Sequence, residues 1–167
     1  PVWIAGSTHA GEEEIILDAH QQLAAENPSL VLILAPRRIE RVEEVATLLK
    51  KRNISFALRS SLKQVETVIL LDTMGELAKV YSLGQVAFIG KSLVKPGGGH
   101  SLIEPLSYGL PVLHGPFVEN IGHVADKAHE LELAITVQNS RDIKEKVSNF
   151  LKNKNLRQEL AKNALSF

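Results

Sequence analysis

The chain has 167 residues, of which 44% are hydrophobic, and this length suffices for one domain with a substantial buried core. Its 19 basic residues are balanced by 19 acidic ones, which excludes generic binding of nucleic acid through a basic surface. The absence of cysteine excludes disulfides and thiolate metal sites, and no apolar run has the length needed to span a bilayer.

Short apolar runs alternate with helical patterns along the chain. We predict strands at residues 2–5, 30–35, 54–57, 67–71, 86–89, 111–113 and 133–137. We predict helices at 12–25, 40–51, 75–83, 101–108 and 120–130, then one or two amphipathic helices with a break at 152–155. Because the chain begins inside a predicted strand, we expect it to be part of a longer protein.

Strict alternation of strands and helices predicts an α/β fold. We expect a Rossmann-like parallel sheet with helices on both faces, formed as a single domain over residues 1–167. Ligands of such sheets bind beyond the carboxyl ends of the strands. The loops at that edge are rich in glycine and polar residues, and they cover residues 6–9, 36–38, 72–76, 97–104 and 114–116.

The segment 97–104 is the richest of these loops, with three glycines, His100 and Glu104. Glycines allow positive φ and a close approach of ligand to backbone, and the helix predicted to follow attracts anions to its free N–H groups. We expect His100 to donate to a phosphoryl or carboxylate oxygen, or alternatively to bond a backbone carbonyl. Glu104 is expected to bind a ribose diol, or alternatively to interact with the helix dipole. The segment therefore indicates a nucleotide-sugar pocket.

The first two strand-end loops offer a hydroxyl and a guanidinium. Ser7 is predicted to contact a phosphate or sugar, with helix capping as the alternative. Arg37 is predicted to pair with a phosphate or carboxylate or to stack on a base. Its alternative is a surface ion pair with Glu40 or Glu44.

The later loops add apolar and charged groups. Met74 is predicted to flank a base, with core packing as the alternative, and Gly75 to present its N–H group to a nucleotide at the start of a helix. For Glu76, a dipole role and ligand binding both remain open. Lys91 and Lys95 either supply charge to a phosphate or are simply solvated.

The remaining charged groups are given structural roles. Glu12, Glu13 and Glu14 at the start of a predicted helix are expected to complement its dipole. Arg38 and Arg41 are expected to be solvated. The six histidines lack metal-ligand spacing, so no metal site is predicted.

Seven segments, taken in order, resemble the C-terminal, donor-binding half of bacterial 3-deoxy-D-manno-octulosonic acid (Kdo) transferases, which are glycosyltransferases of the GT-B type. These segments are residues 3–13, 35–37, 72–77, 88–93, 98–105, 109–112 and 115–116. Two positions depart from the family pattern. Arg38 stands where members usually have histidine, and Ser101 where they usually have asparagine, although serine can still cap a helix.

The resemblance implies transfer of Kdo from CMP-Kdo to the lipid A precursor in lipopolysaccharide biosynthesis, with no metal or other cofactor. The residues it places at the CMP portion are Arg37, Met74, Gly75 and Glu104. Those it places near the phosphate or the sugar carboxylate are Ser7, Lys91, Gly99 and His100.

The resemblance also implies a missing N-terminal domain. That domain would hold the general base, the acceptor site and the membrane-anchoring segment, so no catalytic residue is expected in this chain. The isolated domain is expected to be soluble and inactive, whereas the full-length protein would act at the cytoplasmic face of the bacterial inner membrane.

Three alternatives remain open. The first is a GT-B donor domain for another nucleotide sugar, the second is a nucleotide-sugar 2-epimerase, and the third is a nucleotide-binding module without catalysis. Base preference in binding tests the first, turnover of a UDP-sugar tests the second, and an attached N-terminal domain with an acidic base argues against the third.

Overall fold

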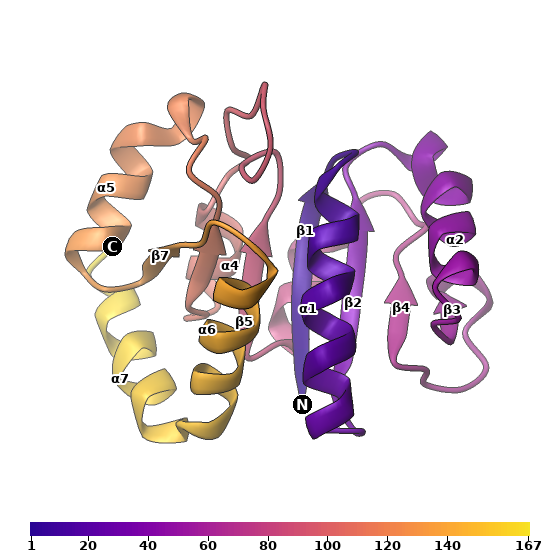
Figure 1. Ribbon diagram of the computed structural model, residues 1–167. Coiled ribbons are helices and arrows are strands. Elements are labelled where there is room, and N and C mark those ends of the chain that lie inside the picture. Colours follow the sequence, from indigo (N-terminus) through magenta and orange to yellow (C-terminus); the bar gives the residue numbers. More distant parts are fainter.

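A computed structural model describes all 167 residues and shows one parallel sheet of seven strands between two layers of helices (Figure 1). The strands are β1 (Val2–Thr8), β2 (Val31–Pro36), β3 (Phe56–Leu58), β4 (Val68–Leu70), β5 (Val86–Ile89), β6 (Val112–His114) and β7 (Ala134–Thr136). The α-helices are α1 (Glu12–Glu26), α2 (Val42–Lys51), α3 (Leu77–Val80), α4 (Ile103–Ser107), α5 (Gly122–Glu130), α6 (Ser140–Lys152) and α7 (Lys154–Ala164). Four 3₁₀ turns complete the chain: η1 (Ile39–Arg41), η2 (Arg59–Ser61), η3 (Tyr81–Leu83) and η4 (Glu119–Ile121). The predicted α/β fold is confirmed.

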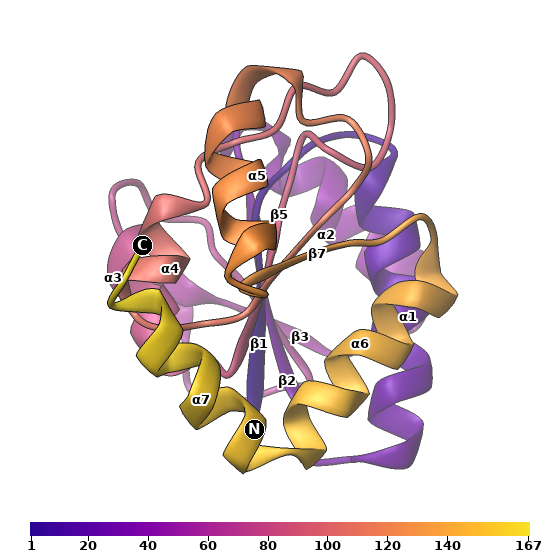
Figure 2. The ribbon, with the colours of Figure 1, turned by 90° about the vertical axis from the view of Figure 1, so that its left-hand side faces the viewer.

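The strand order is β3-β4-β2-β1-β5-β6-β7, and every neighbouring pair is parallel. Helices α1 and α6 lie over one face of the sheet, and α3, α4 and α7 lie over the other (Figure 2). Strand β2 lies beside β1, β3 forms the edge of the sheet, and β4 lies between β3 and β2. The chain then returns to the centre and adds β5 on the other side of β1. The loops after β1 and β5 therefore leave the sheet on opposite faces, and this opens a crevice at the carboxyl edge.

The centre of the sheet is apolar on both faces, as strands covered by two layers of helices require. Strand β5 is buried throughout, and only the two ends of β2 are partly exposed. A single core of 39 buried hydrophobic residues joins the sheet to both helical layers. No helix combines the length and the hydrophobicity that a bilayer-spanning segment needs.

Two predicted helices are shorter in the structure. The helix predicted at 75–83 begins only at Leu77, because Gly75 has φ +79°, and it tightens into η3. The helix predicted at 101–108 is limited to α4. Gly109, with φ +73°, ends α4 in a Schellman motif: the Gly109 N–H donates to the carbonyl of Leu106 and the Leu110 N–H to that of Pro105.

A buried histidine ties α1 to the sheet. The Trp3 indole N–H donates to Nδ1 of His20 over 3.1 Å, and His20 Nε2 lies 3.0 Å from the carbonyl oxygen of Thr67. The indole therefore requires an acceptor at Nδ1, and the carbonyl requires a donor at Nε2. Both partners are satisfied only by neutral imidazole. Burial lowers the pKa of His20 to about 4.

We expect this histidine to make the domain acid-sensitive. The unfolded chain binds a proton at His20 near pH 6.5 and the folded chain only near pH 4, so stability falls as the pH drops through this window. The expected loss is about 3 kcal/mol. Urea unfolding of the wild type and of His20→Gln at pH 7.5 and 4.5 measures it as the difference between the two proteins, because the other histidines with a lowered pKa contribute equally to both. A His20 ring that becomes protonated near pH 6.5 in the folded chain, seen by NMR, would contradict this account.

Candidate functional site

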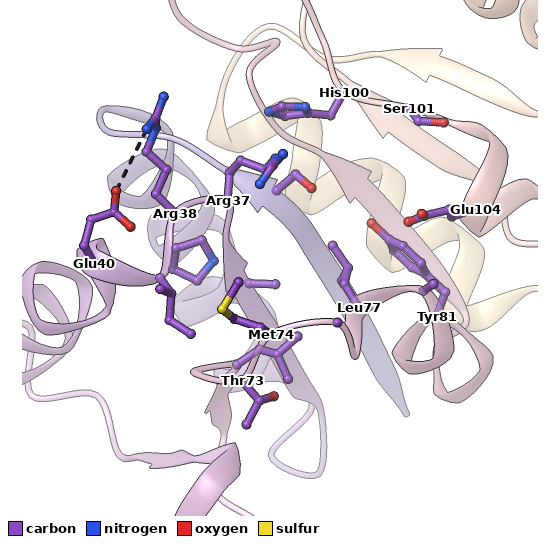
Figure 3. Close-up of a pocket in the computed structure, with 17 residues that line it drawn as sticks. Arg37, Arg38, Glu40, Thr73, Met74, Leu77, Tyr81, His100, Ser101 and Glu104 are labelled. Carbon is purple, nitrogen blue, oxygen red and sulfur yellow. Dashed lines mark ion pairs between the residues drawn. The ribbon is translucent and has the colours of Figure 1, made fainter.

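A cavity of about 650 Å³ opens in the crevice, where β1, β2 and β4 end and the segment before α4 passes over them (Figure 3). Six of the eight predicted site residues are among the 17 that line it: Ser7, Arg37, Met74, Gly75, His100 and Glu104. Lys91 and Gly99 do not line it. The structure thus gathers most of the predicted side chains from four separate loops, and their binding roles stay predictions.

Ser7 lies at a bulge at the end of β1. The pairing of β1 with β2 shifts register between Gly6 and Thr8, and Ser7 between them has φ +56°. The carbonyl of Ser7 packs against Gly90, where an added Cβ would lie 2.2 Å from the Ser7 oxygen. The capping alternative for Ser7 is wrong, because the residue at the N-cap of α1 is Gly11.

A buried carboxylate joins the loops after β1 and β5. The Glu12 side chain is fully buried, and its two oxygens accept hydrogen bonds from the N–H groups of His9, Lys91, Ser92 and Leu93, each over 2.9 Å. A role limited to the helix dipole is therefore wrong for Glu12. Its sequence position gives no sign of partners that lie 79 to 81 residues away.

Lys91 and Gly99 shape the loop between β5 and α4. Lys91 has φ +59°, and its carbonyl accepts a 2.7 Å hydrogen bond from the N–H of Gly99. Gly99 has φ +83°, and an added Cβ there would lie 2.9 Å from the side chain of Ile121. Both the backbone conformation and the tight packing favour glycine at this position.

His100 pairs with a histidine that the sequence analysis did not assign. The Nε2 atoms of His9 and His100 lie 2.8 Å apart and the rings are stacked, so one ring donates and the other accepts. Burial is the main cause that lowers the pKa of His100 to about 4, and the charges of His9, Arg37 and Lys91 lower it further. Burial also lowers the pKa of His9. Both rings are thus neutral at pH 7, and the alternative in which His100 bonds a carbonyl is wrong.

Arg37 reaches the cavity without an ion-pair partner. The acidic residues proposed as alternatives pair elsewhere, Glu40 with Arg38 at 3.9 Å and Glu44 with Arg41 at 3.2 Å. Figure 3 shows Arg37 beside His100, with Arg38 at the same end of the cavity. This end therefore carries positive charge that no carboxylate neutralises at Arg37.

Arg41 departs most from its predicted solvation. It donates to both carboxylate oxygens of Glu13, over 2.7 and 3.0 Å. The side chain of Glu13 is only 1% exposed and that of Arg41 16% exposed, so this ion pair is largely buried. Glu13, like Glu12, serves a tertiary contact that its place in the first helical turn does not reveal.

The loop after β4 places Met74 at the cavity and keeps Glu76 outside its lining. Met74 is 81% exposed at the rim of the cavity, so the core-packing alternative is wrong. Glu76 accepts a hydrogen bond from the Thr73 hydroxyl and pairs with Arg59 at 3.3 Å, and these contacts lower its pKa. Since Glu76 is also absent from the lining of the cavity, its carboxylate braces the loop.

Glu104 lies in the first turn of α4, at the side of the cavity opposite Arg37 and Arg38 (Figure 3). Its carboxylate makes no hydrogen bond or ion pair within the protein and lies beside the phenol of Tyr81 (Figure 3). The residue that departs from the family pattern here, Ser101, accepts a 3.2 Å hydrogen bond from the N–H of Ile103 and so supports the start of α4. Sequence reasoning missed Tyr81, because an aromatic residue in an apolar helical pattern predicts core packing.

The cavity thus has an unpaired cation at Arg37, beside the Arg38–Glu40 pair, together with a free carboxylate at Glu104 and an exposed thioether at Met74. These groups suit an anion, hydroxyls and the face of a planar ring respectively. The histidines include a second pair away from the cavity, His114 and His129, with 2.9 Å between their Nε2 atoms. The structure contains no group of three or more metal-ligating side chains.

Known proteins are similar to this chain in sequence and in fold. The family model described as "Glycosyl transferases group 1" matches residues 13–167. The 3-deoxy-D-manno-octulosonic acid transferase of Haemophilus influenzae is 43% identical over 96% of this chain and 38% of its own length. The enzyme of the same name from Aquifex aeolicus is 34% identical over 89% of this chain and 41% of its own length. The chain thus spans about two fifths of the length of these curated relatives.

Among solved structures, the C-terminal CMP-Kdo binding domain of WaaA from Acinetobacter baumannii has a TM-score of 0.93 to this chain and 32% identity. That match covers 99% of this chain and 87% of the other. The chain belongs to the group 1 glycosyl transferases and, within them, to the family of the C-terminal domains of Kdo transferases.

Proposed function

We propose that this chain is the donor-binding domain of a Kdo transferase, which moves Kdo from CMP-Kdo to the lipid A precursor. The observation that carries the proposal is the cavity at the crevice, where an unpaired guanidinium and an unpaired carboxylate face a single space. CMP-Kdo offers a negatively charged phosphate and carboxylate together with a ribose diol. The similarity to a domain described as CMP-Kdo binding supports the same ligand.

The ligand's parts are assigned by the chemistry of the lining. The base lies against Met74 and Gly75, and the ribose hydroxyls donate to Glu104. The phosphate and the Kdo carboxylate lie toward Arg37, Ser7 and His100. Lys91 and Gly99 act from behind the lining. Lys91 adds positive charge near the histidine pair, and Gly99 sets the path of the loop.

In the transfer step, the bond between the anomeric carbon of Kdo and the phosphate oxygen breaks, and CMP leaves with the bond electrons. Arg37 and the polar groups around it stabilise the charge that develops on the phosphate. The acceptor hydroxyl attacks the anomeric carbon and loses its proton to a base of the N-terminal domain. The chain's own residues need no metal or other cofactor for these roles.

The proposal extends to the parent protein. The acceptor, the general base and the attachment to the cytoplasmic face of the inner membrane belong to the N-terminal portion. We therefore expect the isolated chain to bind CMP and to catalyse no transfer.

Calorimetry with CMP and UMP tests the donor site. We expect the purified chain to bind CMP more tightly than UMP, and Glu104→Gln to weaken CMP binding about tenfold, because a charge-assisted hydrogen bond is lost. Glu159→Gln, at an exposed position of α7, is the matched control and should leave affinity unchanged. Absence of CMP binding at millimolar ligand, or equal binding of UMP, would count against the proposed donor.

A further inference from the structure

Tyr81 is packed closely against the centre of the sheet. It is the first residue of η3, and only 1% of its surface is exposed. Its phenol lies over the bare backbone of Gly6, where an added Cβ would be 1.9 Å from the Tyr81 hydroxyl oxygen and 3.0 Å from Cζ. A strand position without a side chain is thus what makes room for this hydroxyl.

The Tyr81 hydroxyl makes no hydrogen bond within the protein, yet it is not a fully buried orphan, since Thr8 Oγ1 is the one buried side-chain polar atom without a partner. The phenol is not sealed in the core, because Tyr81 belongs to the lining of the cavity. Phenylalanine would fill the same space without an unpaired polar atom. The hydroxyl therefore faces the place where a ligand would supply the partner.

Glu104 faces the same part of the cavity from a different element. Helix α4 packs against η3, and Figure 3 shows the Glu104 carboxylate next to the Tyr81 phenol. Other carboxylates near the cavity are engaged, Glu40 by Arg38 and Glu76 by Arg59. Glu104 and Tyr81 thus form an unpaired acceptor beside an unpaired hydroxyl.

The phenol keeps its proton under ordinary conditions. Burial raises the pKa of Tyr81 well above its usual value, and the charge of Glu104 raises it further. At neutral pH the pair therefore consists of a hydroxyl that can donate and a carboxylate that can only accept. Two adjacent hydroxyls of a ligand complement this pair, since one can donate to the carboxylate while the oxygen of the other accepts from the phenol.

We propose that Tyr81 is a ligand-contacting residue that, together with Glu104, recognises the 2′,3′-diol of the donor's ribose and selects ribonucleotides over deoxyribonucleotides. The inference rests on the proposed donor site and adds a specificity-determining residue to it. The phenol donates to one ribose hydroxyl, and removal of that hydroxyl leaves Tyr81 unpaired as it is in the free protein.

Tyr81→Phe tests the inference, because it removes only the hydroxyl. Calorimetry with CMP, 2′-deoxy-CMP and 3′-deoxy-CMP gives the affinities of the wild-type and variant chains. We expect Tyr81→Phe to weaken CMP binding about five- to tenfold. For the deoxynucleotide that lacks the contacted hydroxyl, the two chains should differ less than about twofold, since neither forms the contact.

Two controls separate recognition from folding. Tyr108→Phe changes the only other tyrosine, which is 46% exposed, and should leave the affinity for CMP unchanged. Tyr81→Phe without ligand should melt at the wild-type temperature or above, because no hydrogen bond within the protein is lost. A lower melting temperature together with unchanged CMP affinity would assign the hydroxyl to stability and overturn the inference.

The outcomes distinguish a failure of the Tyr81 contact from a failure of the proposed donor site. If wild-type chain binds CMP and Tyr81→Phe binds it equally well, or loses affinity equally for all three nucleotides, Tyr81 does not recognise the diol, and the donor site stands. If wild-type chain does not bind CMP, the donor site and the inference both fall.

Discussion

Glu12→Ala is expected to lower the free energy of unfolding by about 4 kcal/mol or more, since each buried N–H left without a partner costs about 1–3 kcal/mol. The carboxylate is fully buried and accepts four backbone hydrogen bonds, from His9 and from Lys91 to Leu93. Urea unfolding measures the loss. Hydrogen exchange of the amides of residues 91–93 locates it, and these amides should lose most of their protection.

Glu14→Ala provides the matched control for Glu12. Glu14 lies in the same first turn of α1, but its side chain is exposed. Its removal weakens only the interaction with the helix dipole, worth about 0.3–1 kcal/mol. Equal losses for Glu12→Ala and Glu14→Ala would show that both residues act on the dipole, and that the bridge between the two loops contributes little.

Arg41→Met is expected to cost about 3–5 kcal/mol, because it leaves the Glu13 carboxylate buried without its partner. Glu13 is 1% exposed and receives two hydrogen bonds from the Arg41 guanidinium. The pair also fixes η1 against α1, next to the cavity wall that carries Arg37 and Arg38. Thermal and urea unfolding at neutral pH measure the effect.

The neighbouring Arg38→Met is the control for Arg41. Arg38 pairs with Glu40 at 3.9 Å, and both side chains are more than two thirds exposed, at 69% and 68%. An exposed pair of this kind contributes less than about 1 kcal/mol. Adding Glu13→Met to Arg41→Met should restore part of the lost stability, since the uncompensated charge is then removed. A loss below about 1 kcal/mol for Arg41→Met alone would contradict the buried ion pair.

The fold was predictable because its signals are local. A strand buried on both faces is a continuous apolar run, as residues 30–35 illustrate, and strict alternation with helices leaves a parallel sheet as the solution. The positions of the site residues follow from the same topology, since all parallel strands point their carboxyl ends to one edge. The sequence alone therefore predicts that Ser7, Arg37, Met74 and Glu104 lie around one cavity, as they do in the structure.

The contacts that the sequence did not reveal are long-range. His9 and His100 are 91 residues apart, and no local pattern selects one histidine as the partner of another. Glu12 and Glu13 satisfy the rule for acidic first turns, so that rule conceals their tertiary partners. The position of Tyr81 in the sequence predicts a core residue. The space for its hydroxyl depends on Gly6 in β1, which no local pattern around Tyr81 indicates.

The Glu12 bridge has a consequence for engineering. Strands β1 and β5 flank the point where the strand order reverses, and a single carboxylate spans that point by holding the loops that follow both strands. The loop that carries His100 therefore cannot be exchanged without the loop that follows β1. A chimera that imports residues 91–100 from another transferase to change donor preference must import the turn with His9 and Glu12 as well, because the two loops behave as one transplantable unit.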